Sequence, residues 1–306
     1  MITLQQVCED YIASNPRLRS PHSMRLLRIS VRHFDEWLGR PATIADLTDV
    51  NLTAYSRRRG NECAAATVER ECSKIATLWR WAALHGHCQP PTIRIDKATT
   101  GVPVAWTRNE VRDLFSAARQ LEGTIGGVAC RVYFPALLGV LWDSGERIGA
   151  LVAVRRSDIS ITRRWLLPDV AWVIFRIRKG NGRPLVRRLR QSTIGPVRRL
   201  LDAHDYQQPF GHVHRTTIYH HFDRLLRSAD LPVDRKHKFH CTRRTVASHL
   251  KRKGIANPLG HSSETIAERY YYDPRITDTR QPADHLFDPL GLWGKISGLL
   301  ETGLRH

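Results

Sequence analysis

The sequence predicts a mainly α-helical chain of two domains, with a small β-sheet or hairpin inserted in the second domain. Through residues 1–88, apolar side chains recur at spacings of three and four, the period of a helix with one buried face. Residues 89–103 then contain three prolines and have no helical period, which is typical of a linker. In the remainder, 104–306, one segment at 164–177 is rich in the Trp, Val, Ile and Phe that favour strands.

Two strongly periodic segments predict the main helices of residues 1–88. Thr3 and Gln6 form a capping box that opens an earlier helix. The two segments end at Gly39 and Gly86, and glycine is the residue that most often ends a helix. Their periodic apolar residues are Met24, Leu27, Val31, Phe34 and Leu38 in the first, and Val68, Cys72, Ile75, Trp79 and Ala82 in the second. We therefore expect a small domain of four or five helices.

Residues 104–306 combine helices with the predicted strands. Thr107 and Glu110 form another capping box, and the apolar stretch from Val132 predicts a buried helix pair around Gly145. The sequence RKGNG at 178–182 is a turn signal between the strand at 164–177 and a second short strand, PLVRRL. Helices are expected again over 192–203, 216–228 and 241–253.

The charge balance predicts a polyanionic partner. The net charge is +19 and the sequence pI about 10.4. Residues 1–100 hold 14 Lys and Arg against 10 Asp and Glu, and the remainder holds 34 against 19. Release of counterions from phosphates drives such a surface onto nucleic acid. We find no basic amphipathic helix with an aromatic face, so a membrane surface is a poorer partner.

Neither the cysteines nor the apolar runs point to secretion. The six cysteines form no C-x-x-C pair and fit no zinc module, so we interpret them as reduced core or surface thiols. No run of 18 apolar residues and no basic, apolar leader occurs, and we expect a cytoplasmic protein that does not enter a membrane.

Arg147 and Lys179 are the first candidates for an anion site. Arg147 lies in the apolar sequence WDSGERIGALVAV, where a buried guanidinium must either pair with an acid, such as Asp143 or Asp158, or receive an anion. Lys179 stands at the predicted hairpin tip, where it is either a solvated charge or an ammonium delivered to a DNA groove.

Two further motifs supply candidates near the C-terminal end. HCTRRTVASHL places His240 and Arg243 three residues apart at a helix start, so they share a face where the helix dipole favours an anion. LGHSSETIAERYYYDPR has His261 followed by three tyrosines that start at Tyr270. A tyrosine phenol either packs half-buried or acts as a covalent nucleophile.

The order of these motifs resembles the tyrosine recombinase (phage integrase) family over nearly the whole chain. Arg in G-x-R-I, Lys on a hairpin, H-x-x-R, L-G-H-S-S and Tyr follow one another as in that family. The resemblance implies a C-shaped clamp around DNA. Its parts are a helical core-binding domain (1–88), a linker (89–103), and an α+β catalytic domain with a C-terminal tail (104–306).

By position, the resemblance assigns six catalytic residues. Arg147 and Arg243 match the phosphate-binding arginines, Lys179 the general acid, and His240 the general base. His261 matches a hydrogen-bond donor to the phosphate. Tyr270 matches the nucleophile, because it lies nine residues after His261, with Tyr271 as the fallback and Tyr272 less favoured.

Three departures from the family pattern bear on activity. Ala150 stands three residues after Arg147, where relatives often carry Glu or Asp. The segment KRKGIANP between SHL and LGH is several residues short, and Glu146 replaces a common Leu. The alternative is therefore a DNA-binding relative with weak or lost catalysis. A third reading is a basic scaffold whose motif match is accidental.

The resemblance implies a site-specific recombinase or integrase of a mobile element or prophage. Such an enzyme cleaves DNA through a 3′-phosphotyrosyl bond, releases a 5′-hydroxyl and reseals by the reverse step, with no cofactor and no metal. Its partners are double-stranded DNA, a homo-tetramer assembled on paired sites, and an accessory DNA-bending protein. The apolar tail from Leu286 to Leu300 is expected to dock on a neighbouring protomer.

Overall fold

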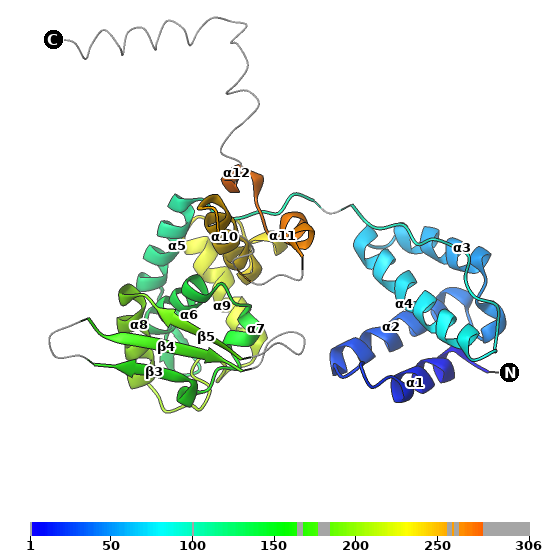
Figure 1. Ribbon diagram of the computed structural model, residues 1–306, viewed down its shortest axis with the longest axis horizontal. Helices are drawn as coiled ribbons and strands as arrows, with labels where there is room; N and C mark the ends of the chain where they lie inside the picture. Colours follow the sequence, from blue (N-terminus) through cyan, green and yellow to red (C-terminus); the bar gives the residue numbers. More distant parts are fainter. Residues whose placement is uncertain are drawn as a thin grey trace, which may run out of the picture. The chain divides into compact units, whose positions relative to one another are not determined.

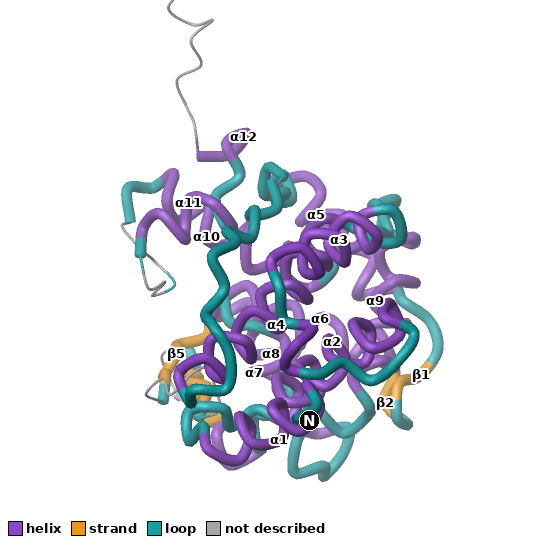
Figure 2. The backbone as a smooth tube through the Cα atoms, turned by 90° about the vertical axis from the view of Figure 1, so that its right-hand side faces the viewer, coloured by secondary structure: helices purple, strands orange, loops and turns teal. Residues whose placement is uncertain are grey.

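The computed structural model describes residues 2–99, 101–163, 168–176, 184–255, 259 and 263–277. The chain forms two compact units, Met1–Gly101 and Val102–His306 (Figure 1). Helices make up most of the described chain and strands a small part of it (Figure 2). The mainly helical fold class with a small sheet is therefore confirmed. The clamp concerns the placement of the two units and stays a prediction.

Unit 1 is built from amphipathic helices whose apolar faces close on one core, which includes Phe34, Tyr55 and Trp79. Local caps set the helix ends. Thr3 Oγ1 accepts a hydrogen bond from Gln6 N at 3.2 Å, and Gly39, with φ of 71°, ends the second helix. In chain order the elements are α1 (Leu4–Ser14), α2 (Pro21–Leu38), η1 (Ile44–Asp46), α3 (Asp49–Gly60) and α4 (Ala65–Leu84).

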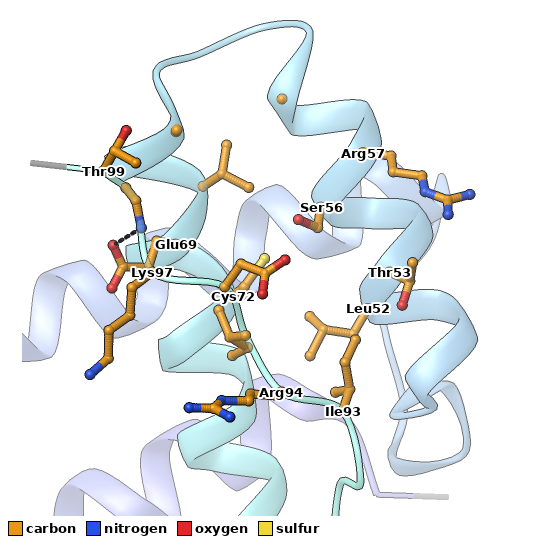
Figure 3. Close-up of a pocket in the computed structure, with 16 residues that line it drawn as sticks. Leu52, Thr53, Ser56, Arg57, Glu69, Cys72, Ile93, Arg94, Lys97 and Thr99 are labelled. Carbon is orange, nitrogen blue, oxygen red and sulfur yellow. Dashed lines mark hydrogen bonds between the residues drawn. The ribbon is translucent and has the colours of Figure 1, made fainter.

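The proline-rich segment after α4 lies along unit 1 as far as Ala98. Ile93 N donates to Asp49 Oδ1 at 3.2 Å, and Ala98 N donates to Glu69 Oε2 at 3.0 Å. Ile93 also packs against the core. With α3 and α4 the segment encloses a pocket of about 560 Å³ (Figure 3). Much of the segment predicted as a linker is therefore fixed on unit 1.

A buried ionic cluster centred on Glu71 ties α2, α3 and α4 together. Its carboxylate accepts hydrogen bonds from Arg59 Nε at 2.9 Å and from Tyr55 Oη at 2.9 Å, and His33 Nδ1 lies 3.0 Å away. Burial alone would raise the pKa of Glu71, but the hydrogen bonds from Arg59, Tyr55 and His33 outweigh it and lower that pKa.

Replacing Glu71 with glutamine is expected to destabilise unit 1 by about 2 kcal/mol, because it removes the charge of the carboxylate to which Arg59, Tyr55 and His33 bind, while Arg59 keeps its ion pair with Glu62. The pKa of Glu71 in the folded protein lies below its ordinary value of 4.5. The charged carboxylate therefore contributes fully to the free energy of unfolding above pH 4.5, and this contribution is lost as the pH falls through the folded pKa. Urea unfolding at pH 7 and pH 3 measures both effects. An equal loss of stability in the variant at both pH values would contradict the assignment.

Unit 2 surrounds the buried helix α6 with further helices and two small sheets. Its helices, including the 3₁₀ turns η2 and η3, are α5 (Arg108–Gln120), α6 (Cys130–Ser144), α7 (Ile148–Leu151), η2 (Arg156–Asp158), α8 (Gln191–Asp202), α9 (Arg215–Ser228), η3 (Arg235–His237), α10 (Phe239–Arg252), α11 (Glu264–Tyr270) and α12 (Pro274–Thr277). Its strands are β1 (Thr124–Ile125), β2 (Val128–Ala129), β3 (Ile159–Thr162), β4 (Val170–Phe175) and β5 (Leu185–Leu189).

The larger sheet is antiparallel in the order β3-β4-β5. In β4, Ala171, Val173 and Phe175 point into the core, whereas Trp172 is 41% exposed, so one face of the sheet is buried. Helices α6 and α8 cover that face (Figure 1). The predicted strand and its partner are confirmed as β4 and β5. Strand β3 was not predicted, because ISIT is too short to show a period.

The turn after α6 sets the direction in which the chain enters α7. Gly145 ends α6 with φ of 63°, a conformation that favours glycine. A Cβ at this position would lie 2.5 Å from Leu259 Cδ2, so the turn packs closely under another segment. The predicted buried helix pair around Gly145 is confirmed, and it places Arg147 directly before α7.

Three sequence predictions fall on residues outside the described part of the chain: Lys179, His261 and the docking tail from Leu286 to Leu300. In the described part, no helix is both long and apolar enough to cross a membrane.

Candidate functional site

Arg147 is the half-buried N-cap residue of α7, and its guanidinium contacts the tyrosine run. Its Nη2 donates a hydrogen bond to Tyr271 Oη at 3.1 Å. The acids predicted as alternative partners bind other arginines. Asp143 Oδ1 lies 2.5 Å from Arg190 Nε, and Asp158 Oδ1 lies 2.5 Å from Arg176 Nε.

Arg243 lies on the buried face of α10 and is 2% exposed. Its Nη1 donates to Gly145 O at 2.6 Å and its Nη2 to Leu259 O at 3.4 Å, so backbone carbonyls hold the guanidinium in one orientation. Glu146 Oε1 stands 4.0 Å from Nη1. Burial lowers the pKa of Arg243, and the nearby charge of Arg147 lowers it further. The two arginines therefore form one cationic centre built from α7 and α10.

Tyr271 covers this cationic centre. It is 7% exposed, and Arg243 Cζ lies 5.3 Å from the centre of its ring. The exposed His240 ring, one turn before Arg243 on α10, lies 5.3 Å from the same ring. Arg147, His240 and Arg243 therefore all contact Tyr271, through its hydroxyl or its ring.

Tyr270 and Tyr272 lie differently. Tyr270 is 40% exposed, its ring centre lies 5.4 Å from Arg269 Cζ, and its carbonyl accepts from Arg244 Nε at 3.2 Å. Tyr272 is 5% exposed with Lys251 Nζ 5.2 Å from its ring, and burial raises its pKa. In this arrangement the predicted nucleophile, Tyr270, is outside the cluster that contains its neighbour.

Ala150 is a buried residue of α7 and offers no side-chain acceptor to orient Arg147. The sequence did not assign roles to Ser248 or Asp273, which hold the backbone of the tyrosine run. Ser248 Oγ donates to Tyr271 O at 3.2 Å and accepts from Asp273 N at 2.9 Å. Ser248 lies within the A-S-H-L sequence used for the resemblance, but no spacing rule marks a serine as a backbone clamp.

The described residues define a two-unit helical chain with paired arginines beside a tyrosine run, and solved structures share this fold. No protein-family model matches the sequence, and no curated protein matches it either. The XerH site-specific recombinase, in a post-cleavage complex with a palindromic difH substrate, aligns with a TM-score of 0.67 and 14% identity, over 95% of this chain and 84% of that chain.

Two integrases align similarly. A lambda integrase dimer bound to a COC′ core site gives a TM-score of 0.65 at 17% identity, over 92% of this chain and 79% of that chain. The Tn1549 transposon integrase, in complex with circular intermediate DNA, gives 0.65 at 14%, over 92% and 100%. The chain therefore has the fold of the site-specific recombinases and integrases, and at these identities the likeness concerns the fold.

Proposed function

We propose that this chain cleaves and rejoins duplex DNA through a phosphotyrosyl intermediate, as a site-specific recombinase or integrase. The observation that carries the proposal is the pair Arg147 and Arg243, which come from different elements and meet at one tyrosine. Two like charges held close together repel one another, and an anion shared between them removes that cost. A DNA phosphate fits, because each guanidinium can donate charge-assisted hydrogen bonds to its non-bridging oxygens.

Such a pair favours the transition state over the bound substrate. Negative charge builds on the equatorial oxygens as phosphorus becomes pentacoordinate, so the bonds from Arg147 and Arg243 strengthen as the barrier is reached. Arg243 is oriented by backbone carbonyls and shielded from water, which makes it a pre-positioned donor that needs little reorganisation.

The nucleophile is proposed to be Tyr270, and Tyr271 is proposed to lie over the position that the phosphate would take. Tyr271 Oη accepts from Arg147, and its ring lies over Arg243, so it takes the place of the phosphate oxygens. An attacking oxygen must instead stand opposite the leaving oxygen, in line with phosphorus. With Arg243 only 2% exposed, a phosphate reaches it after Tyr271 moves away. Tyr270, the neighbouring tyrosine in the sequence, is exposed.

The proton transfers follow from the remaining side chains. The Tyr270 phenol oxygen bonds to phosphorus and passes its proton to His240. The bond from phosphorus to the 5′ oxygen breaks, and Lys179 gives that oxygen a proton. His261 donates a hydrogen bond to the phosphate. Attack by a 5′-hydroxyl reverses each step, so the phosphotyrosyl bond conserves the energy of the phosphodiester.

The substrate and assembly are proposed on charge and on the fold. The surplus of +19 suits a duplex enclosed by both units in a clamp. A lambda integrase structure is a tetramer bound to a Holliday junction, and we propose a tetramer on paired sites for this chain. The tail from Leu286 to Leu300 would then dock on a neighbouring protomer of that tetramer. An accessory DNA-bending protein is a further proposed partner. We propose that the recombinase serves a mobile element and acts in the cytoplasm.

A second candidate function is a DNA-binding relative with weak catalysis. The buried Ala150 favours it, because nothing on that side chain can support Arg147 as an acid would.

Adduct formation separates the two functions. A binding site is first selected from a random-sequence duplex library, and a duplex nicked near the bound centre is then incubated with the protein. We expect an SDS-resistant protein–DNA adduct, because the short fragment released beside the nick cannot return to attack. A protein that binds the duplex and forms no adduct supports the second function instead.

A further inference from the structure

The tyrosine run is tied to the place where the chain enters unit 2. Ala105 N donates to Asp273 Oδ2 at 2.7 Å, and Ala105 O accepts from Arg275 Nη2 at 3.1 Å. Asp273 and Arg275 also bind one another, with Arg275 Nη2 2.7 Å from Asp273 Oδ2. Both polar groups of a single peptide residue are therefore held by the segment that follows the tyrosines.

Helix α10 binds both the tyrosine run and the segment through which the chain enters unit 2. Ser248 Oγ bridges Tyr271 O and Asp273 N, and Thr245 Oγ1 accepts from Trp106 N at 2.9 Å. Helix α10 also carries His240 and Arg243. We call Ser248, Asp273 and Arg275 the clasp. The clasp thus fixes the tyrosine run against α10, the helix that carries Arg243, a proposed phosphate ligand.

Asp273 is a buried carboxylate, and its loss of contact with water must be offset by hydrogen bonds. It is 0% exposed, and burial alone would raise its pKa, but hydrogen bonds from Arg275 and Ala105 outweigh this and lower it. The carboxylate stays ionised and accepts hydrogen bonds from four donors, Ala105 N and Arg275 N, Nε and Nη2. It stands three residues after Tyr270.

We infer that Asp273 is a positioning residue for DNA cleavage: through the clasp it holds the tyrosine run in register with Arg243. The inference rests on the proposed function. Through Asp273 the clasp also binds Ala105, just after the segment that joins the two units: Ala98 N donates to Glu69 of unit 1, and Val104 O accepts from Cys241 Sγ of unit 2 at 3.3 Å. Five residues, 99–103, lie between these anchors.

The test compares Asp273→Ala with wild type on the selected nicked duplex at saturating DNA. We expect the rate of adduct formation to fall about 100-fold, since a displacement of about 1 Å at a reacting group costs that much. The dissociation constant for an unnicked duplex should stay within about 3-fold, because Asp273 contacts no proposed phosphate ligand. Asp273→Asn, which keeps the shape and an acceptor for Ala105 N, should recover about 10-fold of the loss.

A matched control removes a buried carboxylate elsewhere. Asp46→Ala in unit 1 breaks bonds to Arg40 and Thr43, and we expect it to lower the melting temperature while the saturated rate stays within about 2-fold. If Asp273→Ala does not fold, Arg275→Ala takes its place, because that side chain is 63% exposed; it should slow the reaction about 10-fold. A folded Asp273 or Arg275 variant with the wild-type rate overturns the inference.

Hydrogen exchange gives a readout that does not depend on cleavage. In Asp273→Ala, the amides of Ala105 and residues 271–273 should exchange at least about 10-fold faster than in wild type, since their acceptors or anchors are lost. Unchanged exchange at these amides overturns the clasp. If wild type forms no adduct while the exchange result holds, the proposed function fails and the clasp stands as a purely structural fastening.

Discussion

Replacing Arg243 with lysine is expected to slow formation of the protein–DNA adduct by about 10³-fold, with duplex binding nearly unchanged. Arg243 presents a planar fork of donors that two backbone carbonyls, from Gly145 and Leu259, hold in place. A lysine ammonium keeps the charge but cannot bond both carbonyls and two phosphate oxygens at once. The loss falls on the transition state, where the bonds to phosphate are strongest, and therefore appears in the rate at saturating DNA.

The matched control for this substitution is Arg252→Lys on the same helix. Arg252 is the exposed last residue of α10, and its replacement should leave the rate within about 2-fold. Rates are measured by SDS gel on the selected nicked duplex, and melting temperatures are recorded for both variants. If Arg243→Lys folds and forms adduct at the wild-type rate, the cationic centre is structural, and the proposed cleavage site is wrong.

The sequence was sufficient for the helices that carry the site, because their stability follows local rules. The range expected at 241–253 is observed as Phe239–Arg252, and 216–228 as Arg215–Ser228. H-x-x-R then places His240 and Arg243 about one turn apart in any helix. That the guanidinium of Arg147 needs a partner could also be predicted from its apolar surroundings, but the observed partner is Tyr271 and neither of the two expected acids.

Other features depend on contacts between distant parts of the chain and left no local pattern. Asp273 binds Ala105, which is 168 residues earlier, and a D-P pair alone indicates only a turn. Proline content made residues 89–103 resemble a free linker, whereas Ile93 packs against unit 1. Which tyrosine meets the arginines also escapes spacing rules, because adjacent helical residues point about 100° apart and packing decides which of them faces inward.

Replacing Tyr270 with phenylalanine is expected to abolish the adduct, with a loss of at least about 10³-fold, because the variant lacks the oxygen that bonds to phosphorus. Tyr271→Phe is expected to keep the adduct. It retains the ring over Arg243 but loses the hydroxyl that accepts from Arg147. A hydrogen bond to a charged group is worth about 1.5 kcal/mol, and the phosphate no longer has to displace it, so the rate should rise up to about 10-fold.

Tandem mass spectrometry of the tryptic adduct identifies the modified residue independently of the variants, since fragment ions separate Tyr270 from Tyr271. The opposite pattern, with the adduct lost in Tyr271→Phe and kept in Tyr270→Phe, would move the nucleophile one residue along the chain. The contact between Tyr271 Oη and Arg147 would then be the resting position of the attacking group itself. Loss of the adduct in both variants would instead mean that the Tyr271 hydroxyl is needed to orient Arg147, which is the role that Ala150 leaves vacant.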